Sequence, residues 1–333
     1  MNIPLLSPDA LQRISDACCY ISVFLGDEKI SQGTGFAYTA NGEVLTAAHV
    51  VTGRSPIRHC DYKDPDQRIY CKFAGHPAAE YRVFFCSIDL DIPSFTSRIQ
   101  LDLAILLPKS PFATAVSHIP ANVNPPTLGE RVCLAGFSEE LELPFNVDRL
   151  LQHDFSGAAQ FREAMRTGYI ADMTGPLLKQ GNVGNLRRIV AENTQNGDRV
   201  ECDVMYIDNA MHAGASGGPV VNGKGEAVGV LSQRAVTRVD VGQEKVRVPS
   251  GCTVALSLAP LLHIARKTGD AVTEQVVRHG HAPAMCREPR AARSWISPVM
   301  RYRCVPVNSD VEPPLSCELN SSASPPSAVD CPC

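Results

Sequence analysis

Short runs of β-branched, aromatic and aliphatic residues recur along this chain, and turn signals separate them. The first set lies between residues 17 and 107 and reads "CYISVFLG", "GTGFAY", "EVLTAA", "RIYCKF", "YRVFFCSI" and "LAILL". The second set begins near Pro125 and reads "RVCLAGF", "LRRIVAE", "RVECDVMYI", "GPVVN", "EAVGVLS" and "CTVAL". Many short strands at regular spacing, given twice over, predict an all-β chain with two antiparallel barrels or sandwiches in series.

Glycine-containing turns fall between several of these runs. Asn41-Gly42 separates "GTGFAY" from "EVLTAA", and this dipeptide favours a two-residue hairpin because a type I′ turn needs positive φ at both positions. Asn196-Gly197 and the "NGKG" of residues 222–225 are the corresponding turns of the second set.

Two stretches depart from the β pattern, and the end of the chain follows neither pattern. Residues 147–170 carry apolar residues at helical spacing, which predicts a helical insertion within the second set. "LAPLLHIARKTGD", from Leu258, predicts one amphipathic helix that Gly269 ends. Residues 283–333 are rich in Pro, Ser and Cys, so we expect a largely disordered tail.

Composition narrows the class of protein. The net charge is only -4, and no apolar stretch approaches the roughly 20 residues of a membrane helix, so neither nucleic-acid nor membrane partners are expected. The N-terminus lacks a basic start followed by an apolar core, so no secretory signal is expected. The 13 cysteines are an odd number, which favours free thiols in a reducing compartment, the cytoplasm.

The cysteines near the C-terminus raise the alternative of a metal cluster. They form no C-x-x-C pair and no Cys/His quartet, so we expect no metal and no cofactor. The cysteines in question are Cys286, Cys304, Cys317, Cys331 and Cys333.

Ser216 is the candidate nucleophile. It lies in "GASGGP", where Gly214 lets the backbone turn so that the N–H groups of Gly214 and Ser216 can converge on one point beside the hydroxyl. That point is where an oxyanion would form during acyl transfer. Taken alone, "GASGGP" fits a glycine-rich hairpin equally well.

His49 and Asp102 are the candidate base and acid. His49 follows an apolar strand in "GEVLTAAHVV", a position that also suits a packed or capping residue. Asp102 opens an apolar run in "IQLDLAILLP", where an unpaired buried carboxylate would cost several kcal/mol, roughly, so it needs a partner. The alternative is an exposed aspartate at a strand end, which is what we expect of Asp89.

The order His, Asp, Ser, with the first two in one β set and the third in the other, completes a recognisable pattern. "GTGFAYTANGEVLTAAHVV", "DLAIL" and "GASGGPVVNGKGEAVGVLS" resemble a trypsin-like (chymotrypsin-fold) serine peptidase. Their phrasing is closest to peptidases of the HtrA/Deg type and to intracellular trypsin-like peptidases. The resemblance covers roughly residues 17 to 266.

The resemblance implies two six-stranded barrels with an active site in the cleft between them. We therefore expect an N-terminal barrel in residues 1–120, a C-terminal barrel in residues 121–270 and a tail in residues 271–333. Ser216 would be the nucleophile, His49 the general base and then acid, and Asp102 the residue that fixes the imidazole tautomer.

The resemblance also implies how a substrate would bind. The N–H groups of Gly214 and Ser216 would form the oxyanion hole, and Leu231, Ser232 and Gln233 would pair with an extended peptide as an added edge strand. The wall of the specificity pocket would come from residues near Ala210, Met211, Arg234 and Gly251 to Thr253. Ala210 carries no acid at the base of that pocket, so a small apolar residue before the scissile bond is expected rather than Lys or Arg.

Departures from the family pattern matter too. Secreted trypsins carry a cysteine after the catalytic histidine, where this chain has Val50, and secreted zymogens carry an aspartate before the nucleophile, where it has Ala215. Activation by N-terminal cleavage is therefore not expected. The remaining chain of about 70 residues does not have the composition of a PDZ domain.

The sequence thus predicts a serine endopeptidase that acts on protein or peptide substrates. The alternative is a catalytically inactive or latent trypsin-like protein that keeps the barrels and serves as a peptide-binding scaffold. Nothing in the sequence predicts an oligomeric state.

Overall fold

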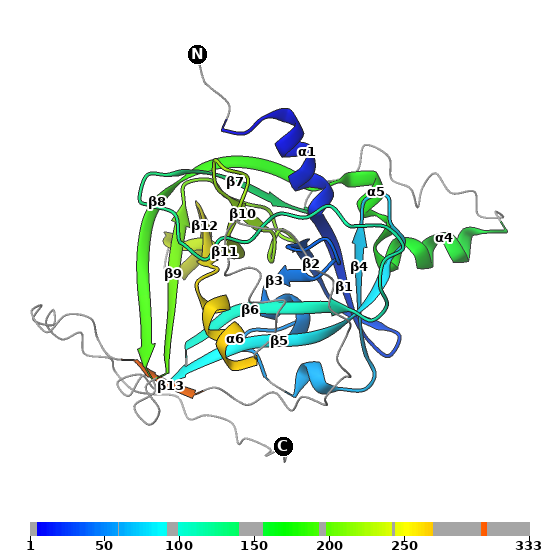
Figure 1. Ribbon diagram of the computed structural model, residues 1–333, viewed down its shortest axis with the longest axis horizontal. Helices are drawn as coiled ribbons and strands as arrows, with labels where there is room; N and C mark the ends of the chain where they lie inside the picture. The colour runs from blue at the N-terminus through cyan, green and yellow to red at the C-terminus, as the bar shows by residue number, and fades with distance from the viewer. Residues whose placement is uncertain are drawn as a thin grey trace, which may run out of the picture.

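The computed structural model of the chain is built mainly from β-strands, with short helices at the periphery (Figure 1). It describes residues 5–58, 60–91, 99–139, 156–192, 198–241, 244–268 and 301–304.

Six strands form the first barrel, in the order β4-β1-β2-β3-β6-β5, and a further pairing of β4 with β5 closes it. All of these pairings are antiparallel. The strands are β1 (Cys18–Leu25), β2 (Glu28–Ala37), β3 (Val44–Thr46), β4 (Gln67–Phe73), β5 (Ala79–Asp91) and β6 (Ile99–Pro108).

Six more strands form the second barrel, in the order β8-β7-β10-β11-β12-β9, closed by the pairing of β8 with β9. Closure of both sets confirms barrels rather than sandwiches. A further strand, β13 (Arg301–Cys304), pairs with β5 of one barrel and β8 of the other. The strands of this barrel are β7 (Arg131–Gly136), β8 (Leu177–Glu192), β9 (Arg199–Ile207), β10 (Pro219–Val221), β11 (Ala227–Val241) and β12 (Glu244–Ser257).

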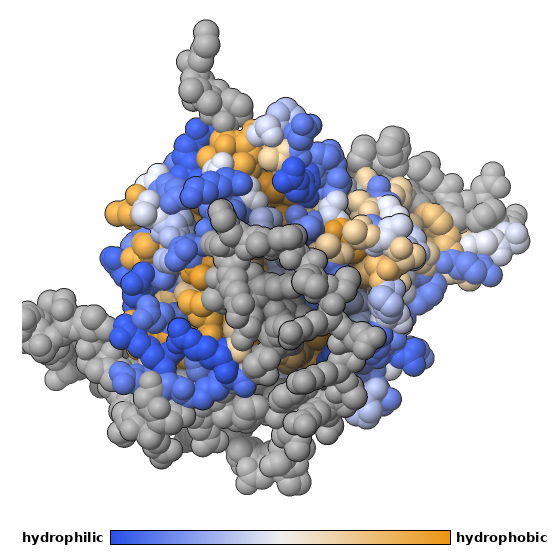
Figure 2. All heavy atoms as spheres, viewed as in Figure 1, coloured by the Kyte–Doolittle hydropathy of each residue, from blue (hydrophilic) through white to orange (hydrophobic). Residues whose placement is uncertain are grey.

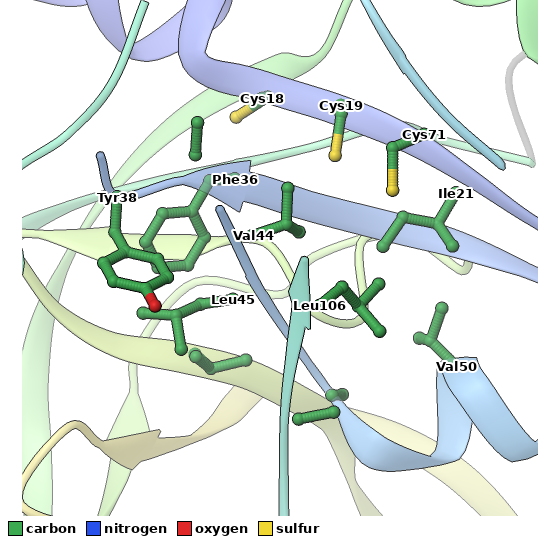
Figure 3. Close-up of a cluster of buried hydrophobic side chains, with 14 of the residues drawn as sticks. Cys18, Cys19, Ile21, Phe36, Tyr38, Val44, Leu45, Val50, Cys71 and Leu106 are labelled. Carbon is green, nitrogen blue, oxygen red and sulfur yellow. The ribbon is translucent and has the colours of Figure 1, made fainter. Parts of the chain in front are cut away.

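Apolar side chains of the strands fill the interior of the first barrel. Phe36 of β2 lies opposite Leu45 of β3, and both side chains are fully buried. Figure 3 shows them with Ile21, Cys71 and other apolar side chains from neighbouring strands in one cluster. Burying a side chain of this size stabilises the fold by about 1.5–3 kcal/mol, so this cluster anchors β2 and β3, the strands that flank the candidate site residues.

The turn between β2 and β3 corrects one prediction. Gly42 has a φ of 81°. In the described part of the chain, Ser87 is the only residue other than glycine with positive φ, so Asn41 does not have the type I′ conformation. The N–H of Gly42 donates to the carbonyl of Thr39 at 3.1 Å and the N–H of Tyr38 to that of Glu43 at 3.0 Å. The turn therefore consists of four residues, because the pairing of β2 with β3 ends too early for a two-residue turn. By contrast, the "NGKG" turn is present, with Gly225 donating to the carbonyl of Asn222 at 3.0 Å.

The helices lie outside the barrels. Helix α1 (Pro8–Ala17) precedes β1 and was not predicted, although Ser7 caps it by accepting the N–H of Ala10 and Pro8 is its first residue. Three short helices lie between β7 and β8, which confirms the predicted helical insertion; residues 147–155 of that prediction lie outside the described residues. These are α4 (Ala158–Ala164), η2 (Met165–Tyr169) and α5 (Ala171–Thr174), and the others are α2 (Ala48–Thr52), η1 (Asp61–Lys63) and α6 (Pro260–Thr268).

Helix α6 is the predicted helix after the second barrel, and it ends at Thr268. The predicted turn at Asn196-Gly197, residues 269–300 and residues 305–333 lie outside the described residues, and the domain boundaries stay a prediction. None of the described helices is long and apolar enough to cross a membrane. On the face seen in Figure 2, polar and apolar residues are interspersed over the described surface.

The insertion of the second barrel packs on the first. Lys72 of β4, only 1% exposed, places its ammonium 2.5 Å from the carboxylate of Asp172 in α5 and 2.8 Å from the carbonyl of Phe73. The same ammonium lies 5.0 Å from the ring centroid of Tyr169. Figure 1 shows α5 beside β4. The two halves of the chain therefore share an ion pair in which the ammonium of Lys72 is buried and the side chain of Asp172 is 42% exposed.

Candidate active site

His49 and Asp102 meet within the first barrel. His49 lies in α2, which begins just after β3, and Asp102 lies in β6, the strand paired with β3. The ring Nδ1 of His49 is 2.7 Å from Oδ2 of Asp102, and the backbone N–H of His49 donates to Oδ1 at 2.9 Å. Both carboxylate oxygens thus bind the same residue, which fixes the imidazole in place and requires Nδ1 to carry a proton.

The two groups change each other's pKa. Burial lowers the pKa of His49, but the hydrogen bond and charge of Asp102 outweigh it and hold that pKa above 6.5. Burial raises the pKa of Asp102, but the bonds from His49 and from Ser232 outweigh it and hold that pKa below 3.8. The site therefore favours the charged form of the carboxylate and the protonated form of the imidazole.

Ser216 joins this pair through Ser232 of β11. The hydroxyl of Ser232 donates to Oδ2 of Asp102 at 2.6 Å, and the carbonyl of Ser232 accepts from the hydroxyl of Ser216 at 3.0 Å. The Ser216 hydroxyl thus points to Ser232 rather than to the ring of His49. Hydrogen bonds of catalytic groups often form only when substrate is bound, and a hydroxyl can turn about its χ1 bond.

The loop before Ser216 turns two backbone N–H groups toward free space. A trans peptide points its carbonyl and its N–H in opposite directions. The carbonyl of Ala213 accepts the N–H of Glu139 at 2.9 Å, so the N–H of Gly214 points the other way. The carbonyl of Ala215 accepts the N–H of Gly218 at 3.0 Å, so the N–H of Ser216 likewise points away from that carbonyl. Neither N–H finds an acceptor among the described residues.

Glycine is required at two positions of this loop. Gly214 has a φ of +88° and Gly217 a φ of +87°, which side chains disfavour. A Cβ at Gly217 would also lie 2.0 Å from the carbonyl oxygen of Thr34, a contact that main chain on both sides cannot relieve. The "GASGGP" motif is therefore fitted against β2 of the first barrel.

Thr34 of β2 binds this loop through hydrogen bonds. Its N–H donates to the carbonyl of Ser216 at 2.9 Å, and its hydroxyl donates to the carbonyl of Gly214 at 2.7 Å. The same hydroxyl accepts the N–H of Phe137 at 2.9 Å. One buried threonine of the first barrel thus holds the loop that carries Ser216.

A cavity of about 500 Å³ unites these groups, because His49, Asp102, Gly214 and Ser216 all line it. The residues predicted to pair with substrate, Leu231, Ser232 and Gln233, line it as well, as does Arg234. Of the residues predicted for the wall of the specificity pocket, Met211 and Thr253 also line the cavity. Ala210 does not, and its carbonyl accepts a hydrogen bond from Lys179 at 2.7 Å.

Sequence reasoning missed residues of the first barrel that line the same cavity. Gln100 holds Ile57 through both main-chain groups, accepting its N–H at 2.7 Å and donating to its carbonyl at 2.8 Å. Gln100 also donates to Asp89 at 2.9 Å, and Asp89 is buried rather than exposed as predicted. A polar residue two positions before Asp102, and so on the same face of the strand, was the sequence signal for Gln100. Gln32 also lines the cavity, and its signal was its position just before "GTGF".

Comparison with known proteins identifies a family for this chain. Residues 33–230, more than half of the 333-residue chain, match the family model described as a trypsin-like peptidase domain. No curated protein matches the chain. Among solved structures, the Rv3671c protease in its inactive form is 16% identical with a TM-score of 0.45, covering 80% of this chain and 100% of that one. The active form of the same protease, from M. tuberculosis, is also 16% identical with a TM-score of 0.45, covering 81% and 93%.

Proposed function

Because the chain belongs to the family of trypsin-like peptidase domains, we propose that it is a serine endopeptidase that hydrolyses peptide bonds through an acyl-enzyme on Ser216. One observation carries the proposal. A single cavity is lined by Ser216, by the hydrogen-bonded pair of His49 and Asp102, and by two backbone N–H groups without an acceptor among the described residues.

In the proposed mechanism His49 moves the proton. The Ser216 hydroxyl turns from the carbonyl of Ser232 toward Nε2 of His49, gives up its proton and attacks the substrate carbonyl. Asp102 keeps Nδ1 protonated and stabilises the imidazolium that forms. His49 then protonates the leaving amine, and water, activated by the same imidazole, releases the acyl group from Ser216.

The N–H groups of Gly214 and Ser216 are proposed to stabilise the oxyanion. They are oriented before the reaction by bonds on the opposite side of each peptide, so little reorganisation is needed when charge develops. Losing one such donor costs roughly a factor of 10²–10³ in rate.

The proposed binding edge is β11. Its pairing with β10 ends at Val230, so the main chain of Ser232 and Gln233 lies beyond that pairing and can accept an extended peptide as a further strand. Ala210 and Arg234 stay our candidates for the specificity pocket, with a small apolar residue preferred before the scissile bond. Arg234, unlike Ala210, lines the cavity.

The test is a fluorophosphonate probe, which reacts only with an activated serine. The native protein should be labelled at Ser216, located by mass spectrometry, and Ser216→Ala should not be labelled. Folded native protein that stays unlabelled would contradict the proposal, as would equal labelling of the variant.

One observation favours the second candidate, a latent peptide-binding protein. In this structure the Ser216 hydroxyl donates to Ser232 and not to His49. If that geometry persists, the β11 edge still binds peptide but no acyl-enzyme forms. Peptide binding without probe labelling would support this alternative.

We also propose that the protein works in a reducing compartment, the cytoplasm. The odd cysteine count supports this location, and burial raises the pKa of Cys86 and of Cys202 in the barrels. Cells are to be lysed directly into denaturant that contains a thiol-alkylating reagent. All 13 cysteines should then carry the alkyl group, which shows that each was a free thiol. Recovery of native disulfide pairs would contradict it.

A further inference from the structure

Gln32 of β2 lines the cavity with its amide held in one orientation. The Nζ of Lys29 and the hydroxyl of Tyr20 both approach Oε1 of Gln32, at 2.5 and 2.6 Å. An ammonium can only donate, so the atom that faces Lys29 must be the amide oxygen. The amide nitrogen therefore faces the other way, and it has no acceptor among the described residues.

The two groups that hold the amide are themselves fixed. The Nζ of Lys29 also donates to the hydroxyl of Tyr20 at 3.2 Å and lies 5.1 Å from the centroid of its ring. The ring of Tyr20 packs edge-on against Phe137, with centroids 5.6 Å apart. Neither Lys29 nor Tyr20 lines the cavity, whereas Gln32 does. The free N–H₂ group of Gln32 is thus the part of this cluster that the cavity can reach.

Gln32 reaches the cavity of Ser216 from β2, whereas the proposed binding edge is β11. It is two residues before Thr34 on the same strand, so both side chains are on one face of β2. Thr34 binds the carbonyl of Ser216, whereas the hydroxyl of Ser216 binds Ser232 of β11. Ser216 thus contacts both strands, and if the acyl part of a peptide pairs with β11, the part beyond Ser216 can extend toward β2.

We propose that Gln32 is a specificity-determining residue that donates a hydrogen bond from its amide nitrogen to a main-chain carbonyl on the leaving-group side of the substrate. Lys29 is a positioning residue, because it keeps the amide from turning over. This inference rests on the proposed function. It adds that the enzyme acts on chains that extend beyond the scissile bond and discriminates against substrates cut at their last residue.

The experiment compares two substrates with the same residues before the scissile bond. One has aminomethylcoumarin directly as leaving group, and the other is a quenched fluorescent peptide with three residues after the bond. The measured quantity is the ratio of kcat/KM for the long substrate to that for the short one. In Gln32→Glu the ratio should fall about five- to ten-fold, the worth of one hydrogen bond.

Gln32→Glu is chosen because it keeps an oxygen for Lys29 and Tyr20 and replaces only the free donor. Lys224→Met, in the exposed turn before β11, is the matched control and should keep the native ratio. Lys29→Met should lower the ratio by letting the amide turn over, and Lys29→Arg, which still only donates, should restore it.

An unchanged ratio in Gln32→Glu, with the short substrate still cleaved by native protein, would overturn this inference alone. If native protein cleaved neither substrate, the proposed function would fail and this inference with it. A fall of the ratio in Lys224→Met equal to that in Gln32→Glu would also overturn it, since the effect would not belong to Gln32.

Discussion

The two barrels hold their share of the candidate site in different ways. In the first barrel, His49 and Asp102 are fixed by two bonds to each other, and Ser232 of the second barrel adds one further bond to Asp102. In the second, Ser216 lies in a loop held mostly by main-chain bonds, and Thr34 of the first barrel supplies one main-chain and one side-chain bond to it. The contact between His49 and Asp102 is thus made within one barrel, whereas the geometry of the loop that carries Ser216 depends on contact between both.

Removing the nucleophile has the largest expected effect. Ser216→Ala should lower kcat by about 10⁶-fold, because no acyl-enzyme can form. The hydroxyl bonds only one main-chain carbonyl, so the melting temperature should change little. Turnover near the native level in purified variant would remove Ser216 from the mechanism.

Breaking the pair in the first barrel comes next. Asp102→Asn should lower kcat by about 10⁴-fold, because the amide favours the wrong histidine tautomer. The measurement is steady-state kinetics on the long peptide substrate. A loss below ten-fold would show that the bond between Asp102 and His49 is structural only.

Breaking the contact between barrels should cost less. Thr34→Val removes the hydroxyl that binds Gly214 and Phe137, so the N–H groups of the loop lose their alignment. We expect kcat to fall about 10- to 100-fold and the free energy of unfolding by about 1–3 kcal/mol. Thr52→Val, another buried threonine bonded only to main chain, is the control and should affect stability more than rate. Equal rate losses in both variants would contradict the comparison.

The pH profile tests the interaction of His49 with Asp102 without a substitution. The pKa of His49 is raised, so kcat/KM should fall about ten-fold per pH unit on an acid limb that lies above pH 6.5. Stability follows the same shift: His49 favours folding below pH 6.5, and this contribution is lost as pH rises through its folded pKa. The pKa of Asp102 is lowered, so its contribution is present above pH 3.8 and lost as pH falls through its folded pKa. An acid limb below pH 6.5 would contradict the charge of Asp102.

The smallest effect on activity is expected at the ion pair that anchors the insertion. Asp172→Ala leaves the buried ammonium of Lys72 with the carbonyl of Phe73 but without a carboxylate and should cost about 2 kcal/mol of stability, whereas Lys72→Met replaces that ammonium by an apolar group and should cost about 1 kcal/mol. Urea unfolding measures both. Rates should stay within about two-fold in either variant, since neither side chain lines the cavity. Equal costs would show that the ammonium is not desolvated.

The strands could be predicted from the sequence because each contains a short apolar run near turn signals, and His49, Asp102 and Ser216 stand out because each lies next to such a run. Prediction from the sequence failed where the conformation or burial of a residue depends on partners from other strands. Asn41 was assigned positive φ from its dipeptide, but the pairing of β2 and β3 ends too early for that turn. Asp89 was expected to be exposed, yet Gln100 gives it a buried partner. Gln32 carries no motif, and its role depends on Lys29 and Tyr20, which only the folded barrel brings beside it.

The bond between Thr34 and Gly214 joins residues 180 positions apart in the chain. Contacts of such sequence separation form late, because a long loop must close first. During synthesis, His49 and Asp102 leave the ribosome well before the loop that they serve. In a partly synthesised chain, His49 and Asp102 can therefore meet before Ser216 has been added, and Ser232, which also bonds Asp102, is added later still. The candidate site is complete only after the second barrel has folded onto the first.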